Sequence, residues 1–261
     1  MRLAKASHGR RTATLRDDST EARHISLSDS APALTLRTRH GEVLTVIIEC
    51  SARKKNAYRM MEADVGPQSI LTVVFVWRGK TPVNIAQNFK VGTGAKLHLI
   101  NITRGSCVHE TVSEVTGARA ESHIDWIVHA QGAMQCRLSA RNVFHGKNGK
   151  GDLTMRGVVE GKAKVTCNGS VEIGPKASGT QAHLSEKVLL LDPTARADAI
   201  PSLDVKTHDV QASHSASISR IHPEDLFYFA SRGIAAKQAR KLFIEGFLGD
   251  LLSQVPLKET W

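Results

Sequence analysis

The chain has 261 residues, 41% of them apolar, which is enough for one sizeable core and typical of a globular domain. No run approaches the roughly 18–20 apolar residues that a membrane-spanning helix needs. Residues 1–11 are basic but lack the apolar stretch of a secretory signal. The composition therefore predicts a cytoplasmic protein with no membrane segment.

The net charge is +10, and much of the excess lies in the first forty residues. Such a segment can bind nucleic acid by neutralising phosphates. No aromatic residue is interleaved there to stack on bases. We expect residues 1–33 to be a basic, partly disordered segment, and keep a nucleic-acid-binding protein as an alternative.

From about residue 34 to residue 221 the chain has short β-branched or alternating runs, separated by turns that contain glycine or proline. No amphipathic helix of three turns interrupts them, which argues against a doubly wound α/β fold and leaves a sandwich, a barrel or a β-solenoid. The clearest runs are 34–39, 42–50, 69–77, 95–102, 122–129, 171–174 and 187–192.

A loose repeat favours the solenoid. Ala133, Ala163 and Ala195 follow turns at steps of 30 and 32 residues. The cysteines at 107, 136 and 167 are spaced by 29 and 31 residues. Small residues that recur at one corner of each coil are typical of a parallel β-helix, so residues 34–222 are predicted to form a β-helix core.

The last part, residues 223–261, is predicted to be helical. Pro223 suits a first helical position, and Gly233 is expected to end that helix. A second helical pattern follows it. We expect the two helices to cap the last coil and protect its open edge, with Phe227 and Phe229 packed on that coil.

Three ordered motifs resemble the SufB/SufD family of iron–sulfur cluster assembly proteins: "LLLDPTARADAIPSLDV", "DVQASHSASISRI" and "LFYFASRGI", followed by a helix that ends in "GF". The resemblance is clear over residues 140–250. It implies a right-handed parallel β-helix with a helical C-terminal segment. It also implies a scaffold on which a transient iron–sulfur cluster is built, in a homodimer or in a heterodimer with a SufB-like paralogue.

The resemblance further implies a partner ABC-type ATPase, SufC, that docks on the C-terminal helices. Tyr228, Arg232 and Gly233 are candidates for that interface, since tyrosine and arginine are enriched at interface hot spots. No GxxxxGK[ST] motif occurs in this chain, so we expect no ATPase activity of its own and no enzyme.

His214, in "ASHSA", lies where the family has a histidine associated with cluster formation. An imidazole can bind iron or carry a proton; the alternative is a strand histidine satisfied by a backbone carbonyl. Three other family positions depart from the pattern. Ala182 stands where SufB-like members have cysteine, Ser215 where they have glutamate, and Ala212 where SufD-like members have cysteine. The chain therefore looks closer to SufD-like members.

Cys107, Cys136 and Cys167 form no CxxC pair. If the coil period is near 30 they lie on successive coils, and with His214 they could hold iron or a sulfur intermediate. The alternative is that they point into the core. A rival function, a β-helix enzyme acting on polysaccharide, usually needs clustered acids and aromatics, which are scattered or few here.

Overall fold

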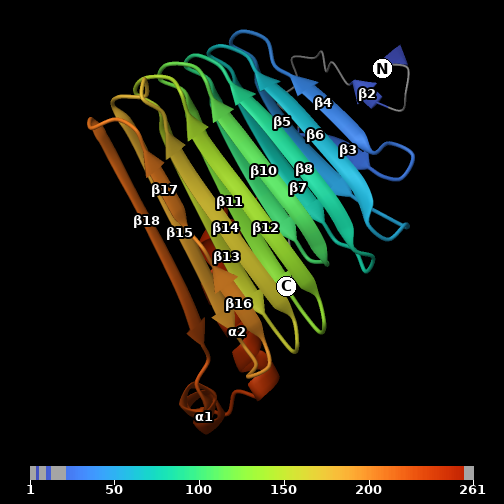
Figure 1. The fold of residues 1–261 in the computed structure, drawn as a ribbon. Helices are drawn as coiled ribbons and strands as arrows, with labels where there is room; N and C mark the ends of the chain where they lie inside the picture. Colours follow the sequence, from blue (N-terminus) through green and yellow to red (C-terminus); the bar gives the residue numbers. More distant parts are fainter. Residues whose placement is uncertain (1–3, 6–9, 13–21, 256–261) are drawn as a thin grey trace.

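The computed structural model describes residues 4–5, 10–12 and 22–255. From β2 to β16, successive strands alternate between two sheets that enclose a shared interior, so the chain forms a parallel β-solenoid, as predicted (Figure 1). Within the described residues, every strand pair is parallel except β1–β2.

We call the two layers sheet A and sheet B. Sheet A comprises β1 (Ala4–Lys5), β2 (Arg10–Thr12), β4 (Ala33–Arg37), β6 (Ala57–Val65), β8 (Val83–Val91), β10 (Cys107–Val115), β12 (Gln135–Phe144), β14 (Lys164–Ile173), β16 (Arg196–Ala199) and β17 (Ser202–Val205). Sheet B comprises β3 (Arg23–Leu27), β5 (Val43–Cys50), β7 (Ile70–Trp77), β9 (Lys96–Thr103), β11 (Glu121–Ala130), β13 (Lys150–Val159), β15 (Thr180–Leu190) and β18 (Val210–Arg220).

Part of the predicted N-terminal segment, residues 1–33, belongs to the solenoid, because β3 is a strand of sheet B. The predicted disorder of this segment concerns residues that lie largely outside the described part of the chain. Its proposed contact with nucleic acid therefore stays a prediction.

The interior between the sheets is filled by alternate residues of the strands from β3 to β15, as the period of two in a strand requires. Its largest fully buried side chains include Trp77, Trp126 and Phe75. His109 lies among them, with ring centroids 5.3 Å from Phe75 and 4.5 Å from Trp126. Burial lowers the pKa of His109 to about 3, so this imidazole is neutral.

Two helices, α1 (Pro223–Ser231) and α2 (Ala236–Leu252), follow the solenoid. Pro223 occupies the first turn of α1, and the carboxylate of Asp225 accepts a hydrogen bond from the backbone N–H of His222 at 3.0 Å. Gly233 adopts φ of 77° just after α1 and ends the helix, as predicted. Neither described helix is long and apolar enough to cross a membrane.

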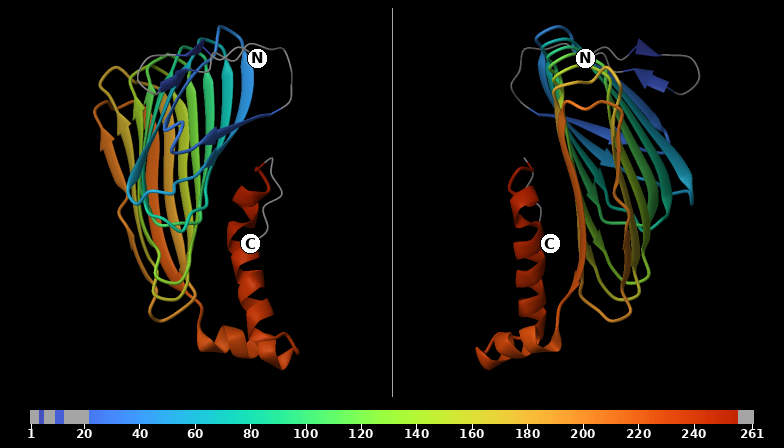
Figure 2. Two further views of the ribbon diagram at one scale, coloured as in Figure 1. Left: turned by 90° about the vertical axis from the view of Figure 1, so that its right-hand side faces the viewer. Right: turned by 60° about the vertical axis from the view of Figure 1, so that its left-hand side comes forward.

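The helices do not cap the last coil, which corrects the prediction from the sequence. α2 instead lies along the outer face of sheet B (Figure 2), and β18 in the last coil stays largely exposed. The physical reason is that the C-terminal halves of the sheet B strands present an apolar outer surface to the apolar side of α2. The side chains in this contact include Val74, Ile100, Ile127 and Leu189 of the sheet and Ile244, Leu248 and Leu251 of α2.

The predicted packing of α1 on the last coil is also wrong. α1 buries no residue, and Phe227 is 75% exposed. Phe229 packs on α2, with its ring centroid 5.4 Å from that of Phe243. α1 is therefore held mainly through α2.

Polar contacts fix α2 at both ends. A nitrogen of Arg240 lies 2.9 Å from Asp192, which follows β15. This hydrogen bond lowers the pKa of the Asp192 carboxyl. Farther along, Arg156 of β13 donates to the carbonyl of Phe247 at 3.1 Å and to Asp250 at 3.2 Å. These contacts set the position of α2 along the strands.

Candidate functional site

The solenoid is uncovered at its C-terminal end. β18 is the last strand of sheet B and pairs only with β15. On the other side of the interior, the last coil contributes the short strands β16 and β17, which both pair with β14. We call β16, β17 and β18 the open end.

His214 lies on the inward face of the open end. It is in register with Leu184 of β15, whose side chain is buried in the interior. No further coil covers β18, so His214 is exposed. Its neighbours on the same face are Ala212 and Ala216, which are too small to cover the imidazole. An exposed imidazole is a chemical group that can bind iron or carry a proton.

The structure also shows where the positions lie at which this chain departs from the family pattern. Ala182 and Ala212 are register partners on β15 and β18, on the same inward face as His214. Ser215 points outward, with its Oγ 3.4 Å from the Oγ of Ser185. Of these four positions only His214 supplies a metal-binding group. Among the described residues, no three His, Cys, Asp or Glu side chains converge so as to hold a metal ion.

The three spaced cysteines lie on successive coils, on β10, β12 and β14. Cys107 and Cys136 are register partners, whereas Cys167 is in register with Leu138 and is thus displaced by two residues. All three side chains are buried in the interior. The structure does not bring them together with the exposed imidazole of His214.

The environment of Cys107 and Cys167 keeps these two thiols protonated. A hydrogen bond with Cys136, together with burial, raises the pKa of Cys107. Burial raises the pKa of Cys167 as well. A neutral buried thiol packs as a small apolar group. The arrangement agrees with the alternative that the cysteines belong to the core.

Glu186 is a residue of this region that the motifs did not single out. It lies on the inward face of β15 and is 0% exposed. Its Oε1 accepts a hydrogen bond from the backbone N–H of Gly169 at 2.6 Å, and its Oε2 has no partner. Burial raises the pKa of its carboxyl. The sequence could have pointed to this residue, because it is a glutamate at one of the alternate, otherwise apolar positions of residues 182–190.

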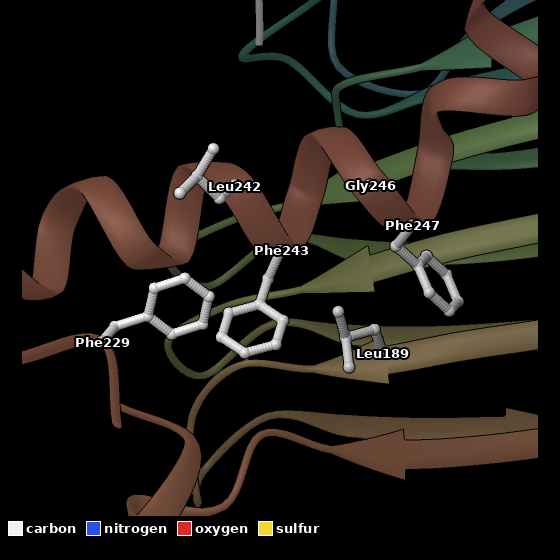
Figure 3. A pocket seen from close by; sticks show the side chains of 6 residues that line it. All are labelled: Leu189, Phe229, Leu242, Phe243, Gly246 and Phe247. Carbon is white, nitrogen blue, oxygen red and sulfur yellow. The ribbon is translucent and has the colours of Figure 1, made fainter. Parts of the chain in front are cut away.

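The candidate ATPase-binding residues lie on α1 and just after it. Tyr228 is 58% exposed, and the guanidinium carbon of Arg232 lies 5.5 Å from the centre of its ring, a cation–π contact. Gly233 is exposed beside them. Between α1, α2 and sheet B lies a pocket of about 280 Å³ (Figure 3), lined by Leu189, Phe229, Leu242, Phe243, Gly246 and Phe247. This region presents exposed apolar surface.

Comparison with known proteins identifies the family. Residues 21–247 match the family described as SUF system FeS cluster assembly, SufBD core domain. The iron–sulfur cluster assembly protein SufD of Bacillus subtilis (strain 168) is 30% identical over 154 residues, 59% of this chain and 35% of that protein. The iron–sulfur cluster assembly SufBD family protein ML0593 of Mycobacterium leprae is 23% identical over 231 residues, 88% of this chain and 25% of that protein.

A relative from Antithamnion, the SufBD family protein ycf24, is 26% identical over 170 residues, 64% of this chain and 57% of that protein. The chain thus spans between a quarter and about three fifths of the length of these relatives. The match of the SufBD core domain covers most of the described solenoid and reaches into α2. The chain belongs to the SufBD core-domain family.

Proposed function

We propose that this chain is a non-enzymatic scaffold subunit of a SUF-type iron–sulfur cluster assembly complex, with ATP hydrolysis supplied by a separate ABC-type ATPase. The observation that carries the proposal is His214, an exposed imidazole on the inward face of β18, the edge strand of sheet B in a SufBD core domain. The assembly role of the named relatives supports the same conclusion.

The open end suits association with a second β-solenoid. An exposed edge strand presents unpaired N–H and C=O groups, which another chain can pair with. β18 offers such an edge over 11 residues. A second copy of this chain or a SufB-like paralogue that paired there would extend sheet B and enclose the inward face that carries His214.

A paralogue fits this arrangement better than a second copy. Ala182 and Ala212 leave this chain without a thiol beside His214, and a forming cluster needs thiolate ligands. A paralogue with cysteine at its own open end would supply them across the interface. In this heterodimer His214 acts as one ligand or as a proton carrier, and the cluster is cargo that leaves.

The histidine is tested by complementation of a cluster-assembly defect with His214→Ala, with melting temperature recorded in parallel. We expect the variant to fold and to join its partner, but to support little cluster formation by iron and sulfide assay. His183→Ala is the matched control, because His183 is an exposed histidine on the neighbouring strand β15. Full complementation by His214→Ala at normal stability would contradict the proposal.

We propose that the ATPase partner binds α1, and the exposed pair Tyr228 and Arg232 supports this proposal. Arg232→Ala should leave the melting temperature unchanged and weaken binding of the purified ATPase in a pull-down. Lys241→Ala is the control, since Lys241 is an exposed cation of α2 that pairs within its own helix with Glu245. Equal binding of both variants would remove Arg232 from the interface.

A further inference from the structure

One corner of the solenoid is strongly basic over three successive coils. At this corner the chain passes from sheet B to sheet A, in the turns 51–56, 78–82 and 104–106. We call these three turns the basic corner. They contain no Asp or Glu and carry six cations: Arg53, Lys54, Lys55, Arg78, Lys80 and Arg104.

The positive charge is confined to this part of the corner. In the next three coils the equivalent turns are 131–134, 160–163 and 191–195, which together carry one cation and two acids. The cations therefore gather in the N-terminal coils, away from the open end. Net charge anywhere on the surface keeps a protein soluble, so solubility does not explain why the charge is concentrated here.

Two acids border the basic corner. The carboxylate of Asp29, in the preceding turn, pairs with Arg59 and accepts a hydrogen bond from the backbone N–H of Arg53 at 3.1 Å. Arg59 is a further cation, so this pair adds no net negative charge. Glu49 lies on the exposed face of β5, just before the first turn. This one remaining carboxylate cannot balance six cations, and the corner keeps a net positive charge.

Close backbone contacts hold the three turns against one another. The backbone N–H of Asn56 donates a hydrogen bond to the carbonyl of Pro82 at 2.8 Å, which ties the first turn to the second. A β-carbon at Gly105 would lie 2.4 Å from the carbonyl oxygen of Gly79, so the second and third turns are also in close contact. The cations are therefore presented from a fixed backbone.

The side chains on this backbone face water and lie near one another. Arg53, Lys54, Lys55, Arg78 and Lys80 are exposed. Neighbouring coils are about 4.8 Å apart, which is less than the Debye length of about 8 Å at physiological ionic strength. Like charges at this spacing repel one another and create a positive potential that attracts a polyanion.

Tyr58 indicates which kind of polyanion fits this surface. It lies on the outer face of β6, directly after the first turn, and it is 57% exposed. An exposed aromatic ring beside a cluster of cations stacks on the bases of a single strand. A lipid surface needs apolar side chains that insert into it. The exposed Val43 and Ile70 of these coils lie at the opposite ends of β5 and β7.

We propose that the basic corner and Tyr58 together form a binding site for single-stranded nucleic acid. The lysines and arginines neutralise phosphates, and the ring of Tyr58 stacks on a base. These contacts are made to the backbone and to base faces, so the site binds without reading the sequence. It lies in the N-terminal coils, far from the open end, and is therefore independent of the proposed cluster assembly.

The test measures binding of a fluorescent oligothymidylate of about 12 nucleotides to the full chain, by anisotropy at about 50 to 300 mM salt. We expect the affinity to fall steeply as the salt concentration rises. Lys54→Gln/Lys55→Gln removes two phosphate contacts, so the slope of log K against log[salt] should become shallower by about 1.4. The melting temperature should stay unchanged, because both side chains are exposed.

Lys147→Gln/Lys176→Gln is the matched control, because it removes two exposed cations from turns at the opposite corner, where sheet A leads to sheet B. Arg10→Gln/Arg11→Gln tests the basic N-terminal segment in the same way. Both variants should keep the slope of the natural chain. A slope that changes in either of them as much as in Lys54→Gln/Lys55→Gln would show that binding follows net charge, and would overturn the proposal. An unchanged slope for Lys54→Gln/Lys55→Gln would overturn it as well.

Tyr58→Leu separates nucleic acid from other polyanions. It should weaken oligothymidylate binding about tenfold at an unchanged salt slope, because one stacked base is lost. Binding of heparin, a polyanion without bases, should not change. An unchanged affinity for the oligonucleotide, or an equal loss for heparin, would overturn the assignment to nucleic acid. Tighter binding to phosphatidylglycerol vesicles than to the oligonucleotide, at the same phosphate concentration, would identify a membrane-binding surface and overturn it too.

Discussion

The central strands of the two sheets have similar lengths, but the sheets differ in what covers their outer faces. In sheet A, buried and partly exposed residues alternate along β8 and β10, because the outer face meets solvent. In sheet B, β7 and β9 begin with the same alternation and then become buried on both faces over their last residues. α2 lies over these C-terminal halves (Figure 2).

The difference shows how a helix is placed on a β-solenoid. Strands buried on both faces read as continuous apolar runs, and the runs of sheet B form one apolar strip across the neighbouring strands. α2 has a matching apolar side and is held there. α1 meets no such strip, and it stays exposed. The outer face of sheet B thus specifies where the C-terminal segment lies.

The largest effect is expected where α2 meets sheet B. Leu248 is fully buried in this contact, so Leu248→Ala should lower the free energy of unfolding by about 2–5 kcal/mol. Leu242→Ala, on the exposed side of the same helix, should cost much less, because Leu242 is 42% exposed. Urea unfolding of both variants makes the comparison. Equal losses would show that α2 does not depend on the strip.

A second prediction concerns the interior that the two sheets share. The pKa of His109 in the folded chain is lowered from its ordinary value of 6.5 to about 3. A lowered histidine pKa means that the unfolded chain binds the proton first, so stability falls as the pH drops below 6.5. Between pH 7 and pH 4 this one group should cost about 3 kcal/mol of stability.

His109→Leu removes the titration while keeping an apolar side chain between Phe75 and Trp126. Unfolding free energies of the natural chain and the variant, measured by urea at several pH values, should converge or cross as the pH falls. Parallel pH profiles would show that His109 is not buried as a neutral group, and that the interior between the sheets admits water there.

The ion pair that positions α2 is expected to contribute less. Arg240 and Asp192 are both partly exposed, so the pair is screened by solvent, and Arg240→Ala should cost about 0.2–1 kcal/mol. Hydrogen exchange should rise in α2 and in the adjoining C-terminal ends of sheet B, but not in sheet A. Exchange that rises equally in both sheets would argue against a local role for the pair.

The smallest effect is expected for the helix that covers neither sheet. Phe227→Ala should change the free energy of unfolding by less than about 0.5 kcal/mol, as is usual for an exposed side chain. The same substitution should weaken ATPase binding if α1 is the docking surface. A loss of stability as large as that of Leu248→Ala would mean that α1 packs on the solenoid after all.

The sequence predicted sheet B better than sheet A. The runs at 42–50, 69–77, 95–102 and 122–129 correspond to β5, β7, β9 and β11, all in sheet B. β6, β8 and β10 were not predicted as individual strands, because polar residues alternate with apolar ones along them. Half-buried strands carry a weaker signal than strands covered on both faces.

The candidate site was predicted in part. The motif around His214 led to an inward-facing residue on the last strand, and the spacing of the cysteines correctly placed them on successive coils. The contact of Glu186 with Gly169 escaped prediction, because Gly169 is 17 residues away on the other sheet. The packing expected of Phe227 was wrong, because a helical pattern does not say which surface will receive the helix.

The sequence by itself determined the coil, because a period near 30 residues and alternation along each strand are local properties that any stacked solenoid must satisfy. Only the tertiary structure decided which end stays open, which face receives α2 and which carboxyl bonds to the backbone of Gly169. Each of these depends on contacts between residues far apart in the chain. The free energy of such contacts comes from surfaces that exist only once the coils have stacked.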